Sequence, residues 1–329
     1  MTIALEERRP ASRALALARK VNIAVVVFLA LYLAIGVLQP AYLEPAGLMN
    51  FLRRAAPLAI LSSGQLFVLA TGGFDLSVGS LVTLTVIGGS MLTANDPSKT
   101  WWAISALYGI GLIVGLINGA VVAYLKTPSI IATLGMLLSV NGVAMMWSGG
   151  SPRGYLPDNF RMFGRFVFHD VPLIRIFPLA IGVLAVCAGF AYWGFHGAVF
   201  GRQVLAVGDN PRAAELAGVQ VRSVRIAVFV ISALVAVTAG IMLGGFGGVS
   251  VDVGLGLELQ SIAACVVGGV QLMGGKGTVT GAIAGALTLF ALFTLLTLLG
   301  LPQPLKETAQ GVILIAAVAS GAWRRRRAV

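Results

Sequence analysis

The chain has 329 residues, of which 58% are hydrophobic and only 11% are charged, and its formal net charge is +11. A soluble domain of this length carries far more charge on its surface, so the composition excludes that class and favours a bundle of membrane-spanning helices. The excess of basic residues then indicates Lys and Arg held on the cytoplasmic side of a membrane, and no nucleic-acid partner is expected.

Apolar runs predict about ten membrane-spanning helices, and therefore an all-α, polytopic bundle that forms a single transmembrane domain over residues 1–329. The first run is longer than the apolar part of a signal peptide and no A-x-A site follows it, so we expect it to be retained. The predicted spans are Val21–Leu38, Ala55–Ala70, Leu76–Thr93, Trp101–Leu125, Ile130–Ser148, Leu173–Trp193, Val224–Gly244, Leu259–Met273, Thr278–Leu299 and Thr308–Trp323.

The positions of Lys and Arg predict the orientation. Most of the 23 basic residues fall on one side of the membrane if the N-terminus is placed inside, so both termini are expected to be cytoplasmic. Residues 1–20 then form a cytoplasmic N-terminal segment, residues 194–222 form the longest cytoplasmic loop, and residues 324–329 form a basic tail that anchors the last helix.

The segment TGGFDLSVGS, which starts at Thr71, places a carboxylate and three glycines between two apolar runs. Its adjacent glycines permit backbone angles that end a helix. Asp75 is expected to cap the next helix by accepting bonds from the amides near Ser77 and Val78. Freed backbone groups at membrane depth line a cavity and do not face lipid, and an ionisable residue there is a functional candidate. A capping role and direct contact with cargo both remain open.

An internal echo supports a core of broken helices. GGFDLSVGS at 72–80 and GGVQLMGGK at 268–276 share Gly, Gly, Leu and Gly at matching places, and both join a span that runs inward to one that runs outward. Transporters with internal repeats show this arrangement. The candidate residues for the broken helix or the translocation pathway are Gly72, Gly73, Asp75, Ser77, Ser80, Asn118, Asn141 and Gln271.

Two groups of glycines recur at four-residue spacing inside predicted spans. Small residues at this spacing allow helix backbones to approach closely in a membrane, so we expect both groups to serve packing. They are Gly111, Gly115 and Gly119, and Gly277, Gly281 and Gly285.

A short helix is predicted inside the longest cytoplasmic loop. Asn210 is a natural N-cap, Pro211 fits the first helical position, and Gly218 suits the residue after the helix end. Ala213 and Ala214 are expected to form a small face for close contact. Such a helix is too short and too weakly apolar to rest stably on the bilayer, so docking onto another protein is the favoured interpretation.

Four segments together resemble the permease subunits of bacterial ABC sugar importers, in the ribose, xylose and arabinose branch. The resemblance covers almost the whole chain, from Leu43 to Ala319. The segments are TGGFDLSVGS at 71–80, TPSIIATLGM at 127–136, GRQVLAVGDNPRAAELAGV at 201–219 and GLELQSIAACVVGGVQLMGGKGTVTGAIAGAL at 256–287.

The resemblance implies a ten-helix permease of the bacterial inner membrane that pairs with a second permease copy, identical or not. It also implies two cytoplasmic ATPase subunits, an extracytoplasmic sugar-binding protein, and a neutral monosaccharide or similar polyol as cargo. ABC permeases carry an E-A-A-x-x-x-G pattern in the coupling helix, and here Arg212 replaces the Glu, which leaves the electrostatic partner on the ATPase open. The coupling-helix residues implied are Asp209, Asn210, Pro211, Arg212, Ala213, Ala214, Glu215 and Gly218.

Other functions are less favoured. The alternative is a proton-coupled secondary transporter that uses Asp75. No catalytic triad or metal-ligand spacing is present, so no enzyme activity, metal or cofactor is expected. GGKGT at 274–278 fails as a P-loop because Val270 stands where the first glycine is required. Asp252 and Glu258 fall in an outer loop, where docking of a binding protein and plain solvation are both open.

Overall fold

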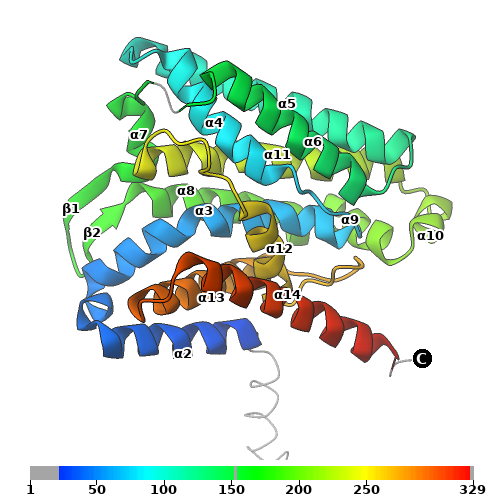
Figure 1. Cartoon of the computed structure of the whole chain (residues 1–329). Helices are drawn as coiled ribbons and strands as arrows, with labels where there is room; N and C mark the ends of the chain where they lie inside the picture. Colours follow the sequence, from blue (N-terminus) through cyan, green and yellow to red (C-terminus); the bar gives the residue numbers. More distant parts are fainter. Residues whose placement is uncertain (1–21, 152–153, 327–329) are drawn as a thin grey trace, which may run out of the picture.

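The computed structural model describes residues 22–151 and 154–326, and helices make up most of it (Figure 1). The helices are α2 (Ile23–Leu38), α3 (Pro45–Ala70), α4 (Val78–Thr93), α5 (Thr100–Tyr124), α6 (Ser129–Ser148), α7 (Asp158–Arg165), α8 (Leu179–Tyr192), α9 (Val199–Asp209), α10 (Pro211–Leu216), α11 (Val221–Gly247), α12 (Leu257–Val267), α13 (Val279–Leu298) and α14 (Gln303–Arg326). Two strands, β1 (Val167–Val171) and β2 (Arg175–Pro178), pair as an antiparallel hairpin.

Each of the ten predicted apolar segments contains one long or short helix of this bundle. Five helical stretches are long and apolar enough to cross a membrane, whereas α2, α4 and α12 are apolar but shorter. The five are Pro97–Tyr124, which includes α5, then α6, then Leu179–Gly197, which continues α8 by one further helical turn, then α11 and α13. The predicted class, a helical membrane bundle, is therefore confirmed. The predicted segment 1–20 and the last three residues of the basic tail lie outside the described residues.

The helical bundle includes one short β-hairpin that the sequence did not predict. The polar stretch before the sixth predicted span contains helix α7 and strand β1, and β2 replaces the start of that span, so α8 begins only at Leu179. The strands are rich in aromatic and β-branched residues, and Phe168 faces Phe177 across the hairpin. Pro178, the last residue of β2, disfavours helix for the residue before it and so fixes the start of α8.

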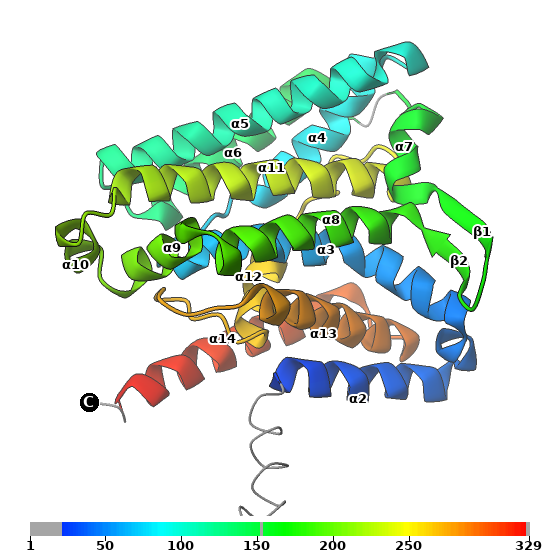
Figure 2. The same ribbon diagram turned by 180° about the vertical axis from the view of Figure 1, so that it is seen from behind.

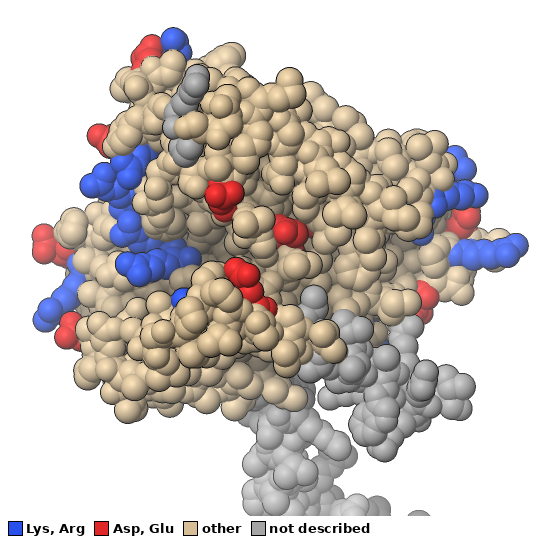
Figure 3. Space-filling view, viewed as in Figure 1, with Lys and Arg blue, Asp and Glu red and all other residues tan. Residues whose placement is uncertain are grey.

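The axes of the long helices are roughly aligned, with α10 at one end of the bundle and the hairpin at the other (Figures 1 and 2). We call these the α10 end and the hairpin end. The described C-terminus lies toward the α10 end. Basic side chains gather at both ends, with a mostly uncharged band between them (Figure 3). This distribution is expected of a protein whose middle lies in lipid.

Helices α3 and α4 occupy the centre of the bundle. All residues of α3 from Ala55 to Ala70 are buried, and so are most residues of α4. Helices α11, α12 and α13 contact α3, while α5, α6 and α11 contact α4. In the chain segment that joins the two helices, Asp75 and Ser77 are buried, while Gly72 is exposed.

The first glycine group packs α5 against α11, as predicted. A Cβ atom at Gly115 would lie 2.7 Å from the Cα of Val230, and one at Gly119 would lie 2.6 Å from the Cα of Ile226. These backbones are therefore too close for any side chain. In the second group, Gly285 approaches the carbonyl of Ala264 on α12 in the same way.

We predict that Gly115→Val or Gly119→Val destabilises the protein by about 1–3 kcal/mol or more, because the added side chain forces α5 away from α11. The measurement is the thermal unfolding midpoint in detergent. Gly109→Val is the matched control, since it lies on the same helix and nothing lies within 4 Å of its Cβ position. An equal loss in the control would contradict the packing role.

Candidate functional site

The centre of the bundle contains a helix break. Helix α3 ends at Ala70 and α4 begins at Val78, and the residues between them are not helical. Gly72 has φ of +79°, a left-handed conformation that favours glycine, and its amide bonds back to the Leu69 carbonyl at 2.9 Å. The predicted break at the glycine pair is therefore present.

Asp75 lies inside this break and is fully buried. Its Oδ1 atom accepts hydrogen bonds from the Ser77 amide at 3.0 Å and the Ser77 hydroxyl at 2.6 Å. Asn118 on α5 donates to the same hydroxyl at 2.9 Å. Three predicted site residues thus form one network, and the predicted bond between Asp75 and the Ser77 amide is observed. The rest of the capping prediction is wrong: Ser77 is the N-cap of α4, and Asp75 lies two residues before it, too early in the chain for its carboxylate to reach the first amides of the helix.

Three buried polar groups near the break have no hydrogen-bond partner among the described residues. They are Oδ2 of Asp75, the Ser232 hydroxyl on α11, and both amide atoms of Gln65 on α3. Ser232 lies beside the Asp75 carboxylate. Sequence reasoning missed Ser232 and Gln65 because each is a single polar residue in an apolar span. The side-chain amide of Gln65 inside such a span is the one signal that could have identified this residue.

Helix α6 holds the extended part of the break. The Phe74 amide donates to the Ser129 hydroxyl at 2.9 Å, and the Leu76 amide donates to the Thr133 hydroxyl at 3.1 Å. Ser129 and Thr133 are one helical turn apart, so both face the same segment. They satisfy backbone donors that have no water to bond. These two hydrogen bonds give Ser129 and Thr133 of the segment TPSIIATLGM a structural role.

The two echo segments meet in space. The loop between α12 and α13 donates the Gly275 amide to the carbonyl of Ala70, the last residue of α3, at 3.0 Å. Gly274 lies against the amide of Gly72. This loop turns tightly, because the Gln271 amide donates to the Lys276 carbonyl at 3.0 Å.

Helix α10 is capped as predicted. The Asn210 side chain accepts from the amides of Arg212 and Ala213, both at 3.1 Å, and Gly218 adopts φ of +86° after the helix. Helix α10 lies at the edge of the bundle in both views (Figures 1 and 2).

Two details of the predicted loop are wrong. Residues 194–222 are largely helical, because α9 precedes α10. Ala213 and Ala214 do not share a face, since neighbours on a helix point about 100° apart: Ala213 is exposed, while Ala214 packs into the core. The exposed apolar residue is Leu216, with 87% of its surface accessible.

The end of α9, just before α10, touches both the break between α3 and α4 and the non-helical loop between α12 and α13, which we call the second break. Gly208, on the last turn of α9, lies against the carbonyl of Ala70. Gly274 approaches Gly208 as well, because a Cβ atom at Gly274 would lie 2.9 Å from the Cα of Gly208. We call the contact of Gly72, Gly208, Gly274 and Gly275 around Ala70 the glycine junction. Gly208 was not among the predicted site residues.

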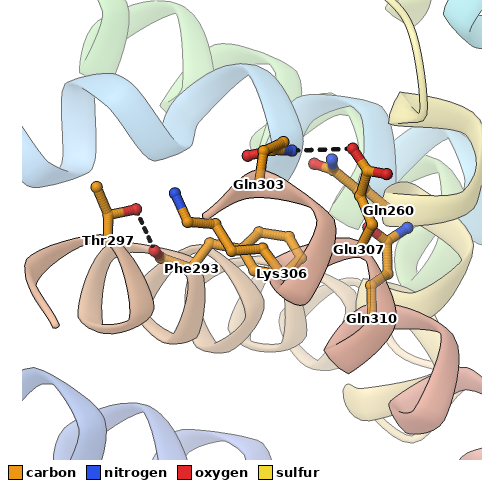
Figure 4. Close-up of a pocket in the computed structure, with 7 residues that line it drawn as sticks. All are labelled: Gln260, Phe293, Thr297, Gln303, Lys306, Glu307 and Gln310. Carbon is orange, nitrogen blue, oxygen red and sulfur yellow. Dashed lines mark hydrogen bonds between the residues drawn. The ribbon is translucent and has the colours of Figure 1, made fainter. Parts of the chain in front are cut away.

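Ser80 and Asn141 line one cavity of about 110 Å³ between α4, α6 and the loop before α12, together with Thr83, Asp252 and Glu258. Gln271 is not part of this cavity. A second cavity of about 120 Å³ lies where α12, α13 and α14 meet (Figure 4). There Gln303 donates to Glu307 at 3.3 Å, beside Lys306 and Gln310.

A family model described as "Branched-chain amino acid transport system / permease component" matches residues 47–318. The chain belongs to this permease family. The permease is similar to proteins named "Autoinducer 2 import system permease protein LsrC". Identity is 34% with that of Salmonella typhi, over 89% of this chain and 82% of the relative. Identity is 32% with the protein of Escherichia coli O157:H7, over 89% of this chain and 84% of that relative. No solved structure matches the permease.

These comparisons confirm what the motifs predicted. The chain is an inner-membrane, multi-pass permease component of an ABC importer and not an enzyme. The described residues contain no group of three or more side chains suited to hold a metal ion.

We predict that Ser129→Ala or Thr133→Val destabilises the permease by about 1 kcal/mol, because each leaves a partly buried backbone amide without its acceptor. The readout is the thermal unfolding midpoint of the detergent-purified protein. Ser139→Ala is the control on the same helix, since its exposed hydroxyl bonds only to its own helix at Gly135. Wild-type stability in both test variants would show that the break does not need these bonds.

Proposed function

We propose that this permease moves a neutral monosaccharide or similar polyol inward, driven by two cytoplasmic ATPase subunits that dock on α10. The observation that carries the proposal is the link from an exposed, capped helix, through the glycine junction, to two helix breaks in the core. The relatives are named for import of autoinducer 2, which makes that molecule the first cargo to test.

The proposed topology has ten membrane crossings, with both termini and α10 in the cytoplasm and the hairpin outside. Helix α12 has 11 residues, or about 16 Å, and cannot cross a 30 Å core alone. Non-helical segments on either side of it complete the crossing, as the break before α4 does for that helix. Shielding by neighbouring helices makes this backbone acceptable at membrane depth.

Several arginines lie at the proposed outer end, against the positive-inside tendency. Two of them have structural partners. Arg53 donates to the Gly164 carbonyl at 3.0 Å and lies over the Phe246 ring at 5.1 Å, while Arg161 lies over the Tyr155 ring at 5.2 Å. These residues hold α7 and its neighbours together, so their position follows from packing.

The remaining partners follow from this topology. Residues 209–218 contact the ATPase, the hairpin end receives a sugar-binding protein, and a second permease copy, identical or different, completes the path. The exposed Leu216 at the end of α10 supplies an apolar contact for the ATPase. The break residues, held by Asp75, Ser77 and Asn118, respond when the ATPase moves α10.

We predict that Leu216→Asp abolishes co-purification of the ATPase subunits, because a charge replaces an apolar docking contact. Leu173→Asp is the matched control, since Leu173 is 95% exposed in the hairpin turn at the opposite end. Both variants should reach the membrane in wild-type amounts. Normal ATPase association in Leu216→Asp, or its loss in Leu173→Asp, would refute docking at α10.

A second candidate is proton-coupled transport through Asp75, favoured by the complete burial of this carboxylate beside Ser232. The variant Asp75→Asn separates the two candidate functions. An asparagine retains an Oδ1 acceptor for both bonds from Ser77 but cannot carry a proton at neutral pH.

We predict that Asp75→Asn retains ATP-driven uptake within about tenfold of wild type, whereas Asp75→Ala loses it because the bonds to Ser77 are gone. The measurement is cargo uptake into proteoliposomes that contain the ATPase, with and without an ionophore that collapses the proton gradient. Loss of uptake in Asp75→Asn, together with sensitivity of the wild type to the ionophore, would favour the proton-coupled alternative.

A further inference from the structure

The cavity beside Ser80 and Asn141 opens on one face of the bundle, between its two ends. Its roof is the non-helical segment 248–256, which leads from the end of α11 at the hairpin end down to α12 (Figure 1). Gly254 lies against the Gly79 carbonyl and donates its amide to the Thr83 hydroxyl at 3.0 Å. Gly79 is near the start of α4, roughly 20 Å along the helix from its outer end. The segment thus brings irregular backbone to membrane depth, where such backbone lines cavities.

The cavity carries two carboxylates without basic partners. Glu258 lies over Gly79, and Asp252 is exposed on the same rim. Among the side chains that the structure describes, the only ion pair joins Lys99 to Asp96, so neither carboxylate is paired with a described cation. Figure 3 shows acidic atoms on this face, within the otherwise uncharged band. A carboxylate facing the middle of a bilayer costs about 2.5–3.5 kcal/mol, so this face borders water or protein and not lipid.

Resting on the function proposed above, we infer that this cavity is a water-filled part of the cargo path that accepts hydroxyl groups and excludes anions. Carboxylates only accept hydrogen bonds, which suits a ligand rich in hydroxyl donors, and the Asn141 amide both donates and accepts. Two unpaired carboxylates in a cleft attract cations and repel anions. A neutral polyol therefore passes, whereas a phosphorylated or carboxylated sugar is rejected by the permease itself.

The test measures access and charge selectivity without any cargo. Asn141→Cys is introduced together with Cys187→Ser, while Cys265 stays in place because it is fully buried. Membranes are treated from the outer side with a cationic and an anionic methanethiosulfonate reagent, each rate being divided by its rate with a small free thiol. The parent without Asn141→Cys gives the background. We expect the cation to react at least about tenfold faster than the anion at position 141.

Ser139→Cys is the matched control for access, because Ser139 lies two residues away on α6, is exposed, and lines no part of this cavity. We expect it to react slowly with both reagents. Glu258→Gln and Asp252→Asn, each combined with Asn141→Cys, test the source of the selectivity. Each should bring the ratio of the two rates closer to one, and Asp252→Asn keeps the test valid if the Glu258 variant fails to fold.

An unreactive Asn141→Cys, or a ratio unchanged in folded charge variants, would overturn the inference. The labelling needs neither the ATPase nor a sugar, so its result is independent of the proposed function. Selective labelling in a permease that shows no ATP-driven uptake would refute the proposed function alone. Uptake without selective labelling would refute the anion-excluding path alone.

Discussion

The structure depends on one constraint: a backbone amide or carbonyl inside the bilayer that does not line a water-filled cavity must find its hydrogen bond within the protein. A permease that interrupts helices in its centre must supply those bonds from its own side chains and loops. The break before α4 receives them from Ser129 and Thr133, and the end of α3 receives one from Gly275. The burial of α3 and α4, the close packing of α5 on α11, and the position of the second loop all serve this requirement.

Apolar length and local capping chemistry made most of the architecture predictable. All ten apolar segments contain helices, and the Asn210 cap was visible because its donors lie two and three residues along the chain. The hairpin and α9 were not found, since a short strand pair beside an apolar run looks like the start of a span, and α9 mixes polar and apolar residues without a clear boundary. Helix length alone cannot assign a helix as short as α12 as a membrane crossing, so it cannot give the number of crossings.

The candidate site, too, was predicted only in part. Gly72, Asp75 and Ser77 stand together in the sequence, and their unusual composition pointed to them. Ser129, Ser232 and Gly208 act on the break from distant parts of the chain, and nothing in their local sequence marks that role. Ser80 and Asn141 were predicted separately, and only the fold shows that they share a cavity with two carboxylates.

The glycine junction has a mechanical consequence. Contacts between side chains have slack, because a side chain can change rotamer and absorb a small displacement. Main chain resting directly on main chain, as Gly208 rests on Ala70, has no such freedom. A shift of the α9–α10 unit by a fraction of an ångström is therefore passed on undiminished to the ends of two interrupted helices. Because no side chain lies between the backbones at the glycine junction, this contact is more rigid than the contacts between side chains elsewhere in the core.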